Sequence, residues 1–84
     1  MDSSWGNFMP HIKVQMYPGR TTEKKEELTQ AIEETIKEVL GATSDSISIA
    51  IEEVAQEAWK KEVVEKEIQR KPETITKQPG YDLK

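Results

Sequence analysis

The chain has 84 residues with a formal net charge of −4, 35% hydrophobic and 33% charged residues, no cysteine and a single histidine. This length predicts one small domain, and the cysteine and histidine counts exclude disulfides, thiolate catalysis and Cys- or His-rich metal sites. There is no basic stripe for nucleic acid and no apolar run near the roughly 18 residues of a membrane span, so we expect a cytoplasmic protein.

Residues 1–9 show no hydrophobic period, and they lack the basic start and apolar stretch of a signal peptide. We interpret them as a leader or tag that is disordered, and residues 10–84 as the single domain. A second interpretation is that Trp5 or Phe8 packs into an apolar pocket of that domain.

The first predicted element is a short strand in which Ile12, Val14 and Met16 alternate with more polar residues. A period of two is typical of a half-buried strand. Pro10 can stand at its start, because a missing N–H there removes no central ladder bond. The turn residues of 18–19, Pro-Gly, close the strand.

A helix of about 19 residues follows, with Thr21 or Thr22 as its N-cap and Gly41 as its stop. Its apolar positions recur at helical spacing. They are Leu28, Ala31, Ile32, Thr35, Ile36, Val39 and Leu40.

Ile47, Ile49 and Ile51 alternate with small residues and predict a second strand. Strand, long helix and strand predict a βαβ unit with parallel strands, hence an α+β fold. Residues 57–70 predict a second, more polar helix that Pro72 ends, and the tail at 73–84 either adds an edge strand or stays loose. Two strands are too few for a stable sheet, so we expect oligomerisation to complete the fold.

Three segments together resemble the 4-oxalocrotonate tautomerase family. They are Pro-His-Ile-Lys-Val at 10–14, Pro-Gly-Arg at 18–20 before the long helix, and Ser-Ile-Ser-Ile-Ala-Ile-Glu-Glu at 46–53. Gln-Glu-Ala-Trp at 56–59 and Lys-Gln-Pro-Gly-Tyr at 77–81 are similar to the bacterial phenylpyruvate-type tautomerases of that family. This resemblance implies an isomerase without a cofactor.

The family uses an N-terminal proline, exposed by removal of the initiator methionine, as general base and acid. Pro10 follows Met9, so the resemblance assigns this role to Pro10. An α-amino group has a pKa near ~8, and an apolar pocket or a nearby cation lowers it. Such an amine is suited to moving a proton at neutral pH.

The resemblance further implies that Arg20 binds a substrate carboxylate and that Trp59 lines the pocket. Ser48 occupies the position where the founding member has a second catalytic arginine. We therefore expect a small monocarboxylate 2-keto acid or its enol, such as phenylpyruvate, rather than a dicarboxylate. A dimer is expected over the hexamer of the founding members, since the residues after Trp59 resemble the dimeric subgroup.

While Met9 remains attached, the Pro10 nitrogen is a tertiary amide without a basic lone pair. Three cases follow: translation begins at Met9, the leader is cloning sequence, or the chain is an inactive relative. The alternative function is thus a non-catalytic tautomerase-fold oligomer that binds a ligand or partner.

Overall fold

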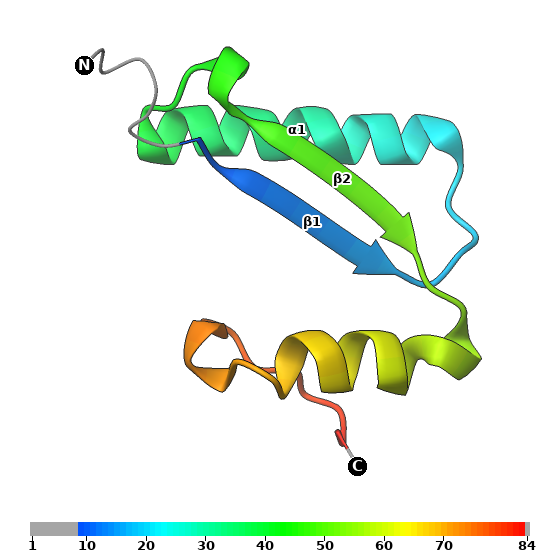
Figure 1. The fold of residues 1–84 in the computed structure, drawn as a ribbon. Helices are drawn as coiled ribbons and strands as arrows, with labels where there is room; N and C mark the ends of the chain where they lie inside the picture. The colour runs from blue at the N-terminus through cyan, green and yellow to red at the C-terminus, as the bar shows by residue number, and fades with distance from the viewer. Residues whose placement is uncertain (1–8, 84) are drawn as a thin grey trace.

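The structure is a computed structural model that describes residues 9–83, so the expected packing of Trp5 or Phe8 lies outside the described residues. Strand β1 (His11–Met16), helix α1 (Thr22–Leu40) and strand β2 (Ser48–Glu53) form the predicted βαβ unit (Figure 1). The fold class is therefore confirmed. Between residues 9 and 83, no helix is long and apolar enough to cross a membrane.

The two strands pair in parallel, with His11 opposite Ser48 and Met16 opposite Glu53. Backbone bonds continue the pairing beyond both ends of the ladder. The N–H of Ser48 donates to the carbonyl of Pro10 at 3.2 Å, and the N–H of Val54 donates to the carbonyl of Met16 at 2.9 Å. Strand β2 thus begins one residue later and ends two residues later than the isoleucine alternation predicts.

Helix α1 has the predicted bounds because both of its ends are capped by local chemistry. The Thr21 hydroxyl accepts a hydrogen bond from the N–H of Lys24, which satisfies one of the free donors of the first turn. At the other end Gly41 adopts φ 73°, the left-handed conformation that glycine reaches without strain, and donates to the carbonyl of Lys37.

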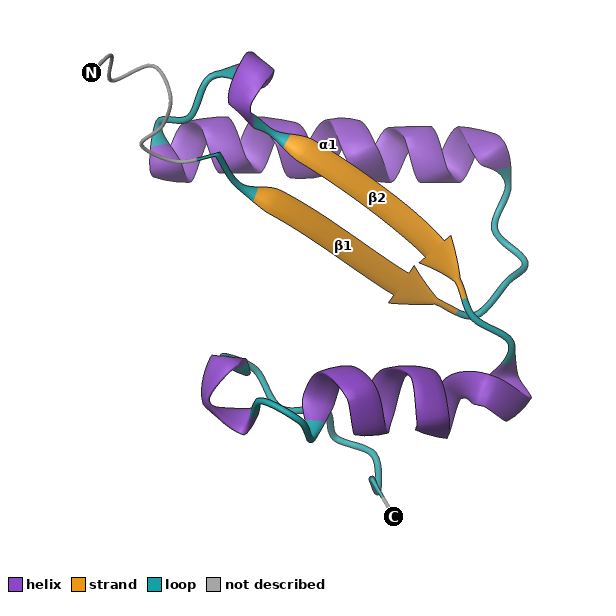
Figure 2. Ribbon diagram, viewed as in Figure 1, coloured by secondary structure: helices purple, strands orange, loops and turns teal. Residues whose placement is uncertain are grey.

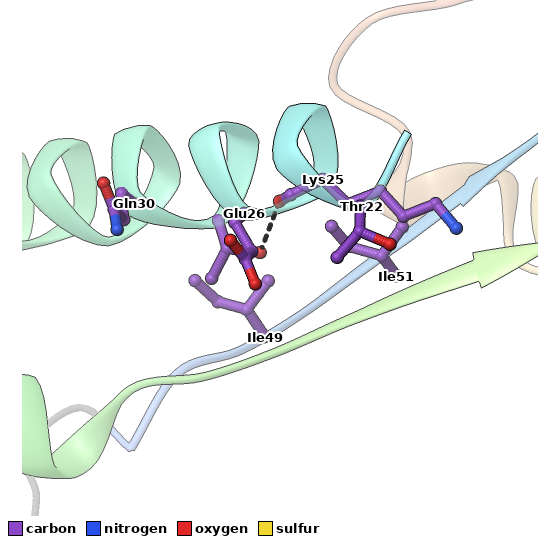
Figure 3. Close-up of a pocket in the computed structure, with 7 residues that line it drawn as sticks. Thr22, Lys25, Glu26, Gln30, Ile49 and Ile51 are labelled. Atoms are coloured by element: carbon purple, nitrogen blue, oxygen red, sulfur yellow. Dashed lines mark hydrogen bonds between the residues drawn. The ribbon is translucent and has the colours of Figure 1, made fainter. Parts of the chain in front are cut away.

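Helix α1 lies on one side of the strand pair, and Ile49 and Ile51 of β2 point toward it (Figures 1 and 3). An ion pair of 2.6 Å between Lys25 and Glu53 joins the start of the helix to the end of β2. A pocket of about 310 Å³ remains between helix and strand. It is lined by Thr22, Lys25, Glu26, Thr29, Gln30, Ile49 and Ile51.

The C-terminal segment lies on the opposite side of the strands (Figure 2). It consists of a 3-10 turn (Gln56–Ala58), a helix (Lys60–Ile68) and a second 3-10 turn (Pro72–Thr74). The helix is wound as a π-helix, and the N–H of Gln69 donates to the carbonyl five residues back, that of Val64, at 2.8 Å. The second helix is confirmed, but its winding was not expected. Of the two expectations for the tail, the edge strand is absent up to Leu83.

Little of the described chain is fully enclosed. Its buried hydrophobic side chains are Ala42, Val54, Val63 and Val64. Helix α1 has no buried residue, and Val39 at its end is 73% exposed. The apolar side chains between α1 and the strands are at best half-buried, which leaves apolar surface that association would cover.

Candidate active site

The predicted functional residues lie at the two ends of β1. Pro10 and Ser48 lie at its start, whereas Arg20 follows its end. Trp59 comes from the C-terminal segment and joins Arg20 in one pocket. A six-residue strand spans about 20 Å, so one copy of the chain does not bring Pro10 to that pocket.

At the start of β1, the backbone of Ser48 is hydrogen-bonded to Pro10, and its side chain is hydrogen-bonded to His11, the residue after Pro10. The Pro10 carbonyl accepts the Ser48 N–H at 3.2 Å, and Ser48 Oγ lies 2.7 Å from Nδ1 of the exposed His11. Pro10 itself is half-buried. Met9 before it has φ 37°, a strained conformation for a residue that precedes proline. The candidate base is therefore half-buried, and the backbone connects it to the hydroxyl and imidazole pair of Ser48 and His11.

At the end of β1 lies a pocket of about 580 Å³. Its lining is Gln15, Met16, Tyr17, Pro18, Arg20, Trp59 and Tyr81. The loop after β1 carries Arg20 to this rim, because Gly19 turns the chain at φ 126° before helix α1 begins. Among residues 9–83, Arg20 has no ion pair, while five lysines of the same region do. No carboxylate of the described residues therefore competes for its guanidinium.

Trp59 forms the apolar wall of this pocket and is contacted by two tyrosines. The rings of Tyr17 and Trp59 meet edge to face, with centroids 5.0 Å apart and planes at 86°. Trp59 Nε1–H donates to the Tyr81 hydroxyl at 3.2 Å. A second pocket of about 440 Å³ shares these three aromatic residues and continues to the tail.

The sequence did not single out Tyr17 and Tyr81 as pocket residues. Tyr17 belongs to the alternation of the first strand, and Tyr81 ends the segment at 77–81 that resembles the phenylpyruvate-type tautomerases. That resemblance is a signal for Tyr81, whereas for Tyr17 only the scarcity of aromatic residues, 6% of the composition, could have drawn attention to it. Since Tyr81 is 22 positions after Trp59, no local spacing predicts their contact.

The arrangement places a guanidinium beside an aromatic wall, on a βαβ unit with parallel strands. Comparison with known proteins identifies the family of this unit. Residues 10–67, more than half of the chain, match the family model for tautomerase enzymes. A probable tautomerase of Xylella fastidiosa is 37% identical over 87% of this chain and 89% of its own length. Tautomerase PptA of Pectobacterium atrosepticum is 34% identical over 87% of this chain and 97% of its own length.

Solved structures give the same assignment. YwhB, a homologue of 4-oxalocrotonate tautomerase, is 38% identical with a TM-score of 0.55, over 56% of this chain and 77% of its own. TomN, a homologue from the tomaymycin biosynthetic pathway, is 28% identical with a TM-score of 0.58, over 60% of this chain and 77% of its own. The chain belongs to the 4-oxalocrotonate tautomerase family and is a tautomerase, an enzyme of the isomerase class.

Proposed function

We propose that this tautomerase interconverts the keto and enol forms of a small 2-keto acid such as phenylpyruvate in the cytoplasm. Pro10, once residues 1–9 are removed, is the general base and acid. One observation carries the proposal: Arg20, without an ion pair between residues 9 and 83, shares a pocket with Trp59. A cation beside an aromatic wall suits a carboxylate that carries an apolar substituent.

The proton transfer follows from the amine of Pro10. The secondary amine takes the proton from the enol hydroxyl and delivers a proton to the neighbouring carbon, so an O–H bond breaks and a C–H bond forms. Proline suits this role because its ring fixes the direction of the lone pair. Arg20 holds the carboxylate, and Trp59 keeps water from the reacting end. Ser48 supplies a hydroxyl near Pro10 but no cation, which favours one carboxylate over two.

A second copy of the chain is part of this proposal. Because a strand length separates Pro10 from the Arg20 pocket, we propose that the amine of one copy reaches the pocket of another. The half-buried strand face and the exposed Val39 offer apolar surface for such an assembly. We propose a dimer rather than a hexamer, and its mass in sedimentation tests this choice.

The test compares three forms of the chain with enol phenylpyruvate as substrate. The chain made from Met9, which begins at Pro10 after methionine removal, should accelerate ketonisation. The chain with residues 1–9 attached should lose about a hundredfold or more, because an amide nitrogen cannot act as base. Pro10→Ala in the trimmed chain leaves a primary amine without the ring and should lose at least about tenfold.

Pro72→Ala is the matched control, since this proline lies on an exposed turn away from the pocket. It should keep the activity of the trimmed parent. Equal rates for the trimmed parent and for trimmed Pro10→Ala would show that Pro10 is not the general base.

The second candidate function is ligand binding without proton transfer. The observation that favours it is the amide at Pro10 in the full sequence, which leaves the Arg20 pocket unchanged. Mass spectrometry of the protein made from its native gene decides between the two. A terminus at Pro10 supports catalysis, whereas an intact Met1 or Asp2 supports binding alone in the native form.

A further inference from the structure

The Trp59 indole is contacted by two residues that are far apart from each other in the sequence. Tyr17, at the end of β1, meets it edge to face at a centroid distance of 5.0 Å. Tyr81, in the tail, accepts the hydrogen bond of its Nε1–H at 3.2 Å. Two contacts in different directions fix both the position and the plane of the indole.

The C-terminal helix places a further apolar side chain in the pocket that Trp59 and Tyr81 share. In a π-helix, residues five apart are joined through the backbone and so lie nearly above one another. Trp59 and Val64 are five apart, and both line the pocket that also contains Tyr81. Val64 is only 3% exposed. Tyr81 and Leu83 of the tail line the same pocket as this buried side chain.

We infer that Tyr81 is a positioning residue that holds the Trp59 indole as a flat wall. Through it the C-terminal tail makes the pocket selective for aromatic over aliphatic carboxylates. A fixed ring stacks on a planar substituent, whereas a mobile ring gives the same apolar contact to either kind of chain. The inference rests on the proposed function only in taking Arg20 as the carboxylate partner, and it places no demand on Pro10.

The first test follows the indole directly in the full chain labelled with nitrogen-15. The two tryptophans give two indole N–H resonances. Tyr81→Phe removes the acceptor and keeps the ring, so the Trp59 resonance should move while that of Trp5 stays. Tyr17→Phe is the matched control, since it removes a hydroxyl but no hydrogen bond to the indole. An unchanged Trp59 resonance in the folded Tyr81→Phe protein would overturn the inference.

The second test measures selectivity with two probes in the full chain by calorimetric titration. Hydrocinnamate has the carbon skeleton of phenylpyruvate without the keto group, and hexanoate is an aliphatic carboxylate. Hydrocinnamate should bind about threefold to tenfold more tightly. Tyr81→Phe should weaken hydrocinnamate about fivefold and change hexanoate less than about twofold. Equal losses for both probes, or no loss for either, would contradict a positioning role.

A failure of the positioning role of Tyr81 can be distinguished from a failure of the proposed catalysis. If the trimmed chain does not ketonise enol phenylpyruvate but Tyr81→Phe still lowers hydrocinnamate affinity selectively, the positioning role stands and the catalytic proposal fails. If the trimmed chain is active and Tyr81→Phe leaves both probe affinities and the indole resonance unchanged, the catalytic proposal stands and the positioning role fails.

Discussion

The two ends of β1 differ in what surrounds their functional residues. At the start, Pro10 is half-buried beside Ser48 and His11, and its nitrogen is an amide in the full sequence. At the end, Arg20 and Trp59 line a pocket of about 580 Å³ whose wall is fixed by further aromatic residues. One end carries the candidate proton donor and acceptor, and the other carries the candidate binding groups.

This separation explains how one small chain can hold every candidate residue and still lack a complete site. A parallel strand pair is stiff, so its ends do not fold toward each other. Bringing base and carboxylate together requires a second copy whose β1 start lies at the pocket of the first. Association of two copies would also enlarge the sparse core, since it would cover apolar side chains that are only half-buried.

The most direct test of this comparison mixes two impaired variants and measures the activity that returns. Trimmed Pro10→Ala and trimmed Arg20→Ala should each be impaired alone. After mixed refolding, half of the dimers contain one copy of each, and one of their two sites keeps both intact residues. Activity should therefore recover to at most about one quarter of the parent value. No recovery would mean that both residues of a site come from the same copy.

A loss of substrate affinity is expected when the Arg20 end alone is changed. Arg20→Ala should raise KM for phenylpyruvate about tenfold to a hundredfold, because a charge-assisted bond to the carboxylate is lost. Arg20→Lys keeps the charge without the planar fork and should lose less. Lys37→Ala is the control, since that lysine pairs with Glu34 at 3.4 Å on the helix surface and lines no pocket with Arg20. A KM equal to that of the parent in Arg20→Ala would remove Arg20 from the site.

The smallest effect concerns stability on the two sides of the strands. Val64 is only 3% exposed, so Val64→Ala leaves a cavity and should lower the free energy of unfolding by about 1–3 kcal/mol. Val39→Ala changes a side chain that is 73% exposed and should stay within about 0.5 kcal/mol in a dissociated chain. Denaturant titration at two protein concentrations measures both. A Val39 effect that grows with concentration would place this residue in the interface between copies.

The βαβ unit could be predicted from the sequence because its signals are local. Helix α1 has the expected bounds since Thr21 and Gly41 cap it within one turn of each end. The parallel strands follow from two short apolar alternations joined by a long helix. The winding of residues 60–68 could not be predicted, because the helix carries i,i+4 charge pairs that suit an ordinary α-helix, such as Glu62–Lys66 at 3.0 Å.

For the candidate site, the sequence by itself determined which residue types are available: a proline after a methionine, an arginine after a turn and a tryptophan after the second strand. Their resemblance to a tautomerase pattern is enough to name Pro10, Arg20 and Trp59. The positions of Pro10 and Arg20 at the two ends of one strand also follow from the sequence, because the strand is a local element. Only the tertiary structure brought Trp59 to the Arg20 pocket and Tyr81 to Trp59. The physical reason is distance along the chain: caps and alternation act over a few residues, whereas these placements depend on packing between segments tens of residues apart.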